Sequence, residues 1–319
     1  MDIILEQCSG VEGITDDVCV YGKNQAEHDK NSLHLLKVAK NNGLVFNSKK
    51  CFISQESITF FGLEWSQDGV QPSLSKCDNI KSKASPRNKA DLQSFLGMIQ
   101  YLSPFIPKLS ERTTALRELL KKDTVWNWNS SHEKIYQMMK EDIHQHLRLS
   151  YFDPHKPTTL EVDSSLNGLG AALIQDGKPI AFASKSLTDT ETRYANIERE
   201  MLAVVFACER FHTYIYGKEI TVQSDHKPLE TIQLKNIAKA PPRLQRMLLR
   251  IQPYQCTITY KPGKEMVFAD FLSRNKPTRG EEIELDHTIH HVMISPERKS
   301  ELVEETANDI ELEILAKQI

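Results

Sequence analysis

Hydrophobic positions divide the chain into two α/β segments separated by a helical segment and followed by a polar tail. In residues 1–75, the runs VEGIT, VCVYG, LVFN, SITFFGLEWS and GVQP predict short strands, with QDG as a hairpin turn. Among them, AEHDKNSLHLLKVAKNNG predicts a helix capped by Gly43, with an apolar face that includes Leu33, Leu36, Val38 and Ala39. We therefore expect a small α/β unit at the start of the chain.

Residues 76–150 are predicted to be helical. Apolar side chains recur at the spacing of one helix face at Leu92, Phe95, Leu96, Ile99 and Leu102. Two more helices are predicted over about 109–121 and 131–147. Trp126 and Trp128, which lie between these helices, are expected to be packing residues.

Residues 151–275 carry a different pattern. TTLEVD, GLGAALIQDG, KPIAFASKSL, EITVQSD and YQCTITY predict strands, with QDGKP as the turn between the second and third. YANIEREMLAVVFACERFHTYIYG predicts a long helix that ends at Gly217 and holds His212 in its apolar stripe. PPRLQRMLLRIQ and MVFADFLSR predict two short helices. This order of elements predicts a mixed sheet with helices packed on it.

Composition narrows the class of protein. The 319 residues suffice for about two domains at ~150 residues each. Six scattered cysteines without a CxxC pair argue against a zinc site or a disulfide framework, and they favour an intracellular location in the cytoplasm or nucleus. Since no run of about 18 apolar residues occurs and the first residues lack a signal-peptide pattern, we expect no membrane partner.

Charge is distributed unevenly. The net charge is −3, but residues 276–319, predicted to be an acidic linker with one amphipathic helix, hold eleven acidic and five basic residues. Residues 227–264 hold eight basic residues and one acidic residue, Glu230. A cationic surface of this kind can contact a polyanion, and the alternative is an ordinary solvated face.

Several carboxylates occupy positions suited to metal binding. Asp163 and Asp225 end two predicted strands, where ligand sites of α/β sheets form. Glu198 and Glu200 lie in the first turns of the long helix, and because they are about 200° apart around it, one of them can join such a site. Asp270 lies in the last predicted helix. Converging carboxylates favour Mg²⁺, whereas a strand-end Asp is more often a cap or turn former.

Residues 151–275 closely resemble the ribonuclease H domain of gypsy-type LTR retrotransposon Pol polyproteins. VDSSLNGLGAAL, YANIEREMLAVVFA, SDHKPL and ADFLSR carry the resemblance, in this order. It implies that the family's metal-binding carboxylates are Asp163, Glu200, Asp225 and Asp270. It also implies two Mg²⁺ ions, with Mn²⁺ as an alternative, and hydrolysis of RNA in an RNA·DNA hybrid.

The upstream residues resemble the same polyprotein. GITDDVCVYG looks like the reverse transcriptase palm around its catalytic pair, here Asp16 and Asp17, and DLQSFLGMIQYL looks like the start of the thumb and connection. The resemblance implies a truncated palm (1–75), a helical thumb and connection (76–150), a ribonuclease H domain with a mixed five-stranded sheet (151–275) and a linker (276–319). Because the family's third polymerase Asp and its fingers lie upstream of this point, we expect Asp16 and Asp17 to be a remnant pair without independent polymerase activity. Another Pol-type chain is a further expected partner.

Substrate contacts are predicted on one helix. Arg243, Arg246 and Arg250 share a face, either as a ridge that contacts phosphates or as the polar side of an ordinary amphipathic helix. Lys227 beside Asp225 is a further candidate contact, and His226 is left outside the catalytic set. The function is either that of a two-metal ribonuclease or that of a catalytically silent nucleic-acid-binding relic or host-adopted fragment.

Overall fold

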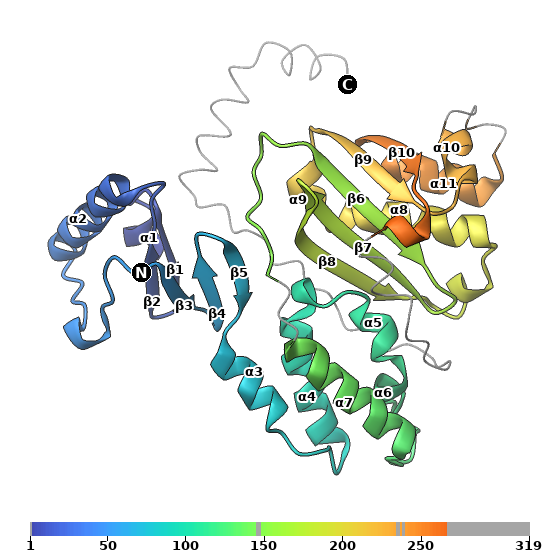
Figure 1. Cartoon of the computed structure of the whole chain (residues 1–319), viewed down its shortest axis with the longest axis horizontal. Coiled ribbons are helices and arrows are strands. Elements are labelled where there is room, and N and C mark those ends of the chain that lie inside the picture. The colour runs from blue at the N-terminus through green and yellow to red at the C-terminus, as the bar shows by residue number, and fades with distance from the viewer. Residues whose placement is uncertain (1, 145–147, 234–236, 238–239, 267–319) are drawn as a thin grey trace. The chain divides into compact units, whose positions relative to one another are not determined.

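The computed structural model of the chain describes residues 2–144, 148–233, 237 and 240–266 (Figure 1). Among these residues, none of the helices is long and apolar enough to cross a membrane. Most of the predicted helix MVFADFLSR, including Asp270, and the predicted linker 276–319 lie outside the described residues. The boundaries expected between palm, thumb, ribonuclease H domain and linker stay a prediction.

The N-terminal segment contains a helix-covered hairpin. Its elements are α1 (Asp2–Leu5), β1 (Val11–Ile14), β2 (Asp17–Val20) and α2 (Gln25–Asn41). The predicted cap is confirmed: Gly43 has φ +71°, and the amide of Leu44 donates to the carbonyl oxygen of Ala39 at 2.9 Å. The predicted apolar face of α2 is wrong at Leu33 and Leu36, which are exposed. The buried face follows the i, i+4 spacing through Leu35 and Ala39 instead.

A three-stranded antiparallel sheet comes next. Its elements are η1 (Ser48–Lys50), β3 (Ser57–Phe60), β4 (Leu63–Ser66) and β5 (Gly69–Pro72). SITFFGLEWS is therefore a hairpin and not one strand, because Phe61 and Gly62 have φ +53° and +69°, as a two-residue type I′ turn requires. LVFN, predicted as a strand, forms none. The QDG turn between β4 and β5 is confirmed.

The helical segment contains more breaks than its periodicity predicts. Its elements are α3 (Leu74–Lys81), α4 (Lys89–Tyr101), η2 (Ser103–Phe105), α5 (Leu109–Arg112), α6 (Thr114–Glu118) and α7 (Ser130–His144). The predicted face of α4 is confirmed, since all five of its apolar residues are buried. The helix predicted over 109–121 is interrupted at Thr113, whose hydroxyl donates to the carbonyl oxygen of Leu109 at 2.8 Å. Trp126 and Trp128 stack at 5.7 Å and pack on this core, as expected.

The second α/β segment contains the predicted five-stranded mixed sheet. Its strands are β6 (Thr158–Ser164), β7 (Gly168–Gln175), β8 (Lys178–Ser186), β9 (Glu219–Ser224) and β10 (Gln255–Tyr260). They lie in the order β10-β9-β6-β7-β8: β9 pairs in parallel with β10 and with β6, whereas β7 pairs antiparallel with β6 and with β8.

Helices complete this segment: η3 (Glu191–Arg193), α8 (Asn196–Arg210), α9 (His212–Ile215), α10 (Pro228–Gln233), α11 (Pro242–Ile251) and η5 (Gly263–Glu265). The predicted long helix therefore breaks at Phe211, before Gly217 with its φ of +76°. His212 is exposed and lies 3.0 Å from the hydroxyl of Tyr254, so its assignment to the core is wrong. The break rotates His212 off the stripe that α8 buries.

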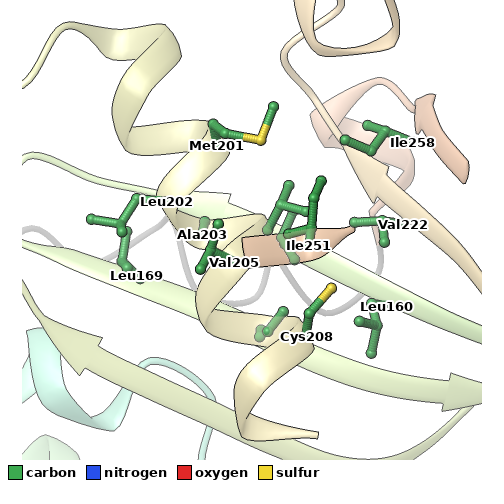
Figure 2. Close-up of a cluster of buried hydrophobic side chains, with 14 of the residues drawn as sticks. Leu160, Leu169, Met201, Leu202, Ala203, Val205, Cys208, Val222, Ile251 and Ile258 are labelled. Atoms are coloured by element: carbon green, nitrogen blue, oxygen red, sulfur yellow. The ribbon is translucent and has the colours of Figure 1, made fainter. Parts of the chain in front are cut away.

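The core between the sheet and α8 fixes the position of the functional site. Figure 2 shows side chains of α8 such as Met201, Ala203 and Val205 among residues of the strands and of α11. These three residues of α8 are fully buried. Burial of each large apolar side chain contributes about 1.5–3 kcal/mol, so α8 is firmly held against β6 and β7.

Candidate metal centre at the strand ends

Three of the four predicted carboxylates meet at one edge of the sheet. Each of Asp163, Glu200 and Asp225 offers a carboxylate oxygen, and these oxygens all lie within 4.8 Å of one another. Asp163 is the next-to-last residue of β6, and Asp225 directly follows β9. Because β6 and β9 are parallel neighbours, their carboxyl ends coincide and the two Asp side chains converge. Asp270 lies outside the described residues.

Glu200 is the buried member of the group. Its side chain projects from α8, it is 4% exposed, and one carboxylate oxygen accepts a hydrogen bond from the hydroxyl of Ser164 at 2.8 Å. The other oxygen is buried without a hydrogen-bond partner. Burial, with further contributions from Asp163 and Asp225, raises the pKa of Glu200 to about 8. A buried, unpartnered carboxylate oxygen is a position where a cation would replace the lost hydration.

The choice between Glu198 and Glu200 follows from their positions on α8. Both oxygens of Glu198 accept from the guanidinium of Arg243, at 2.9 and 2.8 Å. Glu198 also accepts from the amide of Ala195 at 3.0 Å, as the third residue of a helix commonly does. Glu198 therefore stabilises the start of α8, and Glu200 faces Asp163 and Asp225.

Asp225 is the exposed member of the group. Partial loss of hydration, and next the charge of Asp163, raise the pKa of Asp225 above its ordinary range. Gly263 lies against it, since a Cβ at Gly263 would be 3.2 Å from an Asp225 carboxylate oxygen. Gly263 thus approaches the site closely, and the absence of a side chain gives the backbone the room to do so.

Two charged residues from α5 and its N-terminal flank also reach this edge, and sequence reasoning missed both. The ammonium of Lys108 contacts the carboxylate of Asp163, and Lys108 is 3% exposed. Burial raises the pKa of Glu111, one of whose carboxylate oxygens is buried without a hydrogen-bond partner. The sequence feature that could have predicted this contact is the pair Gly168 and Gly170 in β7. Two glycines on one face of a strand indicate that another segment packs closely against it.

The three arginines of α11 do share one face, opposite the buried Leu244, Met247, Leu248 and Ile251. Arg243 pairs with Glu198, and the guanidinium of Arg250 donates to both carboxylate oxygens of Glu209, at 2.9 and 2.8 Å. Arg246 donates to the carbonyl oxygen of Pro242 at 3.4 Å. Two arginines therefore connect α11 to α8, and their role in phosphate binding stays a prediction.

The remaining predicted residues lie at the surface. Lys227 is exposed two residues beyond Asp225, and His226 lies 3.4 Å from the side chain of Asn196. Asp16 lies in the turn between β1 and β2, and Asp17 is the first residue of β2, both exposed. The roles assigned to these residues stay predictions.

The chemistry of the three-carboxylate group fits a divalent cation. Carboxylates are hard oxygen donors that suit Mg²⁺, Mn²⁺ or Ca²⁺, and neither His nor Cys belongs to the group. Burial first, and the neighbouring carboxylates next, raise the pKa values of Glu200 and Asp225, so part of the effect is repulsion within the group. A cation bound among them would remove that repulsion.

Comparisons with known proteins agree with this geometry. Residues 153–254 match the family described as the RNase H-like domain found in reverse transcriptase. Over 309 residues, 93% of this chain, the sequence is 29% identical to the Transposon Tf2-3 polyprotein and to the Transposon Tf2-7 polyprotein of Schizosaccharomyces pombe. The chain spans 23% of the length of these polyproteins.

Solved structures give the same fold. The foamy viral protease-reverse transcriptase in complex with RNA/DNA hybrid aligns with a TM-score of 0.72 at 22% identity, over 88% of this chain and 39% of that one. The dRH form in complex with double-stranded DNA aligns with a TM-score of 0.72 at 23% identity, over 81% and 47%. The chain is therefore similar over most of its length to gypsy-type LTR retrotransposon Pol polyproteins, and its residues 153–254 match the RNase H-like domain found in reverse transcriptase.

Proposed function

We propose that this chain is a two-metal ribonuclease that hydrolyses the RNA strand of RNA·DNA hybrids. The observation that carries the proposal is the convergence of Asp163, Glu200 and Asp225, which come from β6, α8 and the residue after β9. The relationship to retrotransposon polyproteins and the RNase H-like domain support the same class of reaction. Hybrid specificity and the identity of the ions belong to the proposal.

Each carboxylate has a distinct role in the proposed reaction. Asp163, at the end of β6, would be a metal ligand, whereas exposed Asp225 would face the substrate side. Glu200 would be held by the hydroxyl of Ser164 while its free oxygen points to a cation. Asp270 is proposed as the fourth ligand from the sequence motif ADFLSR. Bound Mg²⁺ ions supply an activated water and stabilise the charge of the leaving oxygen.

Substrate binding is proposed to be electrostatic. Phosphates of a hybrid would approach exposed Asp225, with Lys227 exposed two residues beyond it, and the exposed arginines of α11 are further candidate contacts. Lys227 is the nearest of these to the carboxylates along the chain. Contacts of this kind position a duplex without reading its sequence, so cleavage would depend on the helical form of the hybrid.

The test is cleavage of a 5′-labelled RNA strand annealed to DNA, with Mg²⁺ and with EDTA. We expect Asp163→Asn, Glu200→Gln and Asp225→Asn to lose cutting by about a hundredfold or more, because each removes a metal ligand. Glu198→Gln is the matched control on the same helix turn, and it should keep most of the activity. Circular dichroism would confirm that each variant is folded.

Two outcomes would contradict the proposal. Equal activity of all three ligand variants and of the parent would show that these carboxylates are not the catalytic site. Tight binding of hybrid without metal-dependent cutting, by folded protein, would favour the silent nucleic-acid-binding alternative.

A further inference from the structure

Lys108, which lies outside the RNase H-like domain, forms an ion pair with Asp163, one carboxylate of the proposed metal centre. Lys108 directly precedes α5, 55 residues before Asp163, and its ammonium contacts an Asp163 carboxylate oxygen. Lys108 is 3% exposed, and the Asp163 side chain is 17% exposed. A buried ammonium needs a charged partner, and Asp163 provides it, so removing either charge would leave the other uncompensated.

The sheet is shaped to receive this lysine. Asp163 of β6 and Gly170 of β7 are directly paired across the sheet, so they share a face. A Cβ at Gly170 would lie 2.9 Å from Cγ and 3.1 Å from Cε of Lys108, which means that the side chain runs directly over the glycine. A Cβ at Gly168 would likewise lie 3.3 Å from Glu111. Glycine at both positions leaves a track along β7 for residues 108–111.

Further contacts hold this segment in place. The amide of Ser110 donates to the hydroxyl of Ser184 at 3.0 Å, and the hydroxyl of Ser110 donates to the carbonyl oxygen of Ser184 at 3.1 Å. Lys108 itself has φ +45° and ψ +36°, the left-handed region that non-glycine residues adopt at an energetic disadvantage. Docking on β8 therefore compensates an unfavourable backbone conformation that directs the Lys108 side chain toward Asp163.

The charges at this edge explain why the lysine is there. Asp163, Glu200 and Asp225 lie within 4.8 Å of one another, and like charges this close destabilise the folded protein. The ammonium of Lys108 favours the ionised forms of both Glu200 and Asp225, so it acts on the whole group. It supplies one positive charge where a divalent ion would supply two.

We propose that Lys108 is an internal cation that competes with divalent metal for Asp163, so that metal loading of the centre requires release of the Lys108–Asp163 ion pair. This inference rests on the proposed function, because it assumes that Asp163 is a metal ligand. It follows that the docking of residues 108–111 on the RNase H-like domain is coupled to metal binding, each opposing the other. A partner or substrate that displaces this segment from β7 and β8 would raise the affinity of the centre for metal.

The test compares metal binding by the parent chain with binding by Lys108→Met, which keeps the apolar stem and removes the charge. Isothermal titration with MgCl₂ and with MnCl₂ should give a dissociation constant at least about tenfold lower for Lys108→Met, because a nearby positive charge no longer repels the ion. Lys108→Arg keeps the charge and should bind metal about as weakly as the parent. Lys156→Met is the matched control, because it breaks another Lys–Asp pair, with Asp176 in the β7–β8 turn.

Thermal melting separates competition from a merely structural role. In EDTA, Lys108→Met should melt below the parent because Asp163 loses its counter-ion. Added Mg²⁺ should narrow or reverse that difference, since the ion replaces the lost charge. A structural lysine would lower the melting temperature equally with and without Mg²⁺.

The outcomes distinguish the two proposals. If the parent and all variants bind neither Mg²⁺ nor Mn²⁺, the proposed metal centre fails. If the parent binds metal and Lys108→Met binds it equally or more weakly, the competition is refuted while the centre stands.

Discussion

The raised pKa of Glu200 leads to a prediction about the stability of the metal-free protein. Folding holds a proton on Glu200 up to about pH 8, whereas the unfolded chain releases it near the ordinary value of 4.5. Between these two values the folded state binds more protons than the unfolded state. The free energy of unfolding therefore falls as the pH rises through this window, and it levels off above about pH 8.

The size of the effect follows from the same values. Each pH unit within the window changes the free energy of unfolding by about 1.4 kcal/mol for one proton, so the upper limit is roughly 5 kcal/mol. Electrostatic relaxation of a buried group reduces this, and we expect about 2–4 kcal/mol between pH 5 and pH 8.5. Glu200→Gln should abolish this dependence, because the amide does not titrate and can still accept from Ser164.

Hydrogen exchange in EDTA is the suitable assay. The three tryptophans, Trp65, Trp126 and Trp128, all lie outside residues 153–254, so intrinsic fluorescence would report on other parts of the chain. Exchange of amides in β6 and α8 reports local opening of the RNase H-like domain itself. The ratio of rates between the parent and Glu200→Gln at each pH cancels the intrinsic dependence of exchange on pH.

We expect this ratio to rise by about 30-fold or more from pH 5 to pH 8.5, which corresponds to about 2 kcal/mol. Glu209→Gln, an exposed change on the same helix, should give a ratio that is constant across the range. A constant ratio for Glu200→Gln as well would refute the reasoning, since Glu200 would then have the same pKa in the folded and unfolded states.

Two further predictions test other parts of the structure. Gly170→Ala should lower the free energy of unfolding by about 1–3 kcal/mol in urea titrations, because the new Cβ would overlap the Lys108 side chain. Gly97→Ala in α4 is the matched control: its Cβ would enter open space, so this change should raise the free energy of unfolding by about 0.5–1 kcal/mol. If the arginine face binds phosphates, Arg246→Ala should lower the slope of log binding constant against log salt concentration by about 1, the loss of one phosphate contact. Arg243→Ala should in addition lower the melting temperature, because it breaks the ion pair with Glu198. A salt dependence of binding unchanged in Arg246→Ala would favour the ordinary amphipathic helix.

Sequence patterns predicted the elements whose burial is continuous and local. The five strands of the RNase H-like sheet and the buried face of α4 all matched, because alternation and helical spacing report directly on which side faces the core. Patterns failed where a short-range interaction interrupts a periodic run. Thr113 divides α5 from α6 through its own side chain, and the Phe61–Gly62 turn divides one apolar run into two strands.

The candidate site divides along the same line. Asp163 and Asp225 were predictable from strand ends, because parallel neighbours place their carboxyl ends together. Spacing left Glu198 and Glu200 as equal alternatives, and the motif resemblance selected Glu200. The structure gives the physical reason why Glu198 is not in the group: its carboxylate accepts hydrogen bonds from Arg243 and from the amide of Ala195. A helix position alone does not show which of two glutamates has a partner elsewhere.

Lys108 marks the limit of reasoning from local sequence. Nothing in its immediate surroundings distinguishes it from a solvated lysine before a helix, and its contact with Asp163 requires the docking of α5 on β8. The evidence in the sequence lies 60 residues away, in the two glycines of GLGAAL. Glycine in a buried strand lowers its stability unless another segment needs the space. Because residues 108–111 fill the space above both glycines, the docking of this segment on β7 accounts for the glycines, for the left-handed backbone of Lys108 and for the position of its ammonium at the candidate metal centre.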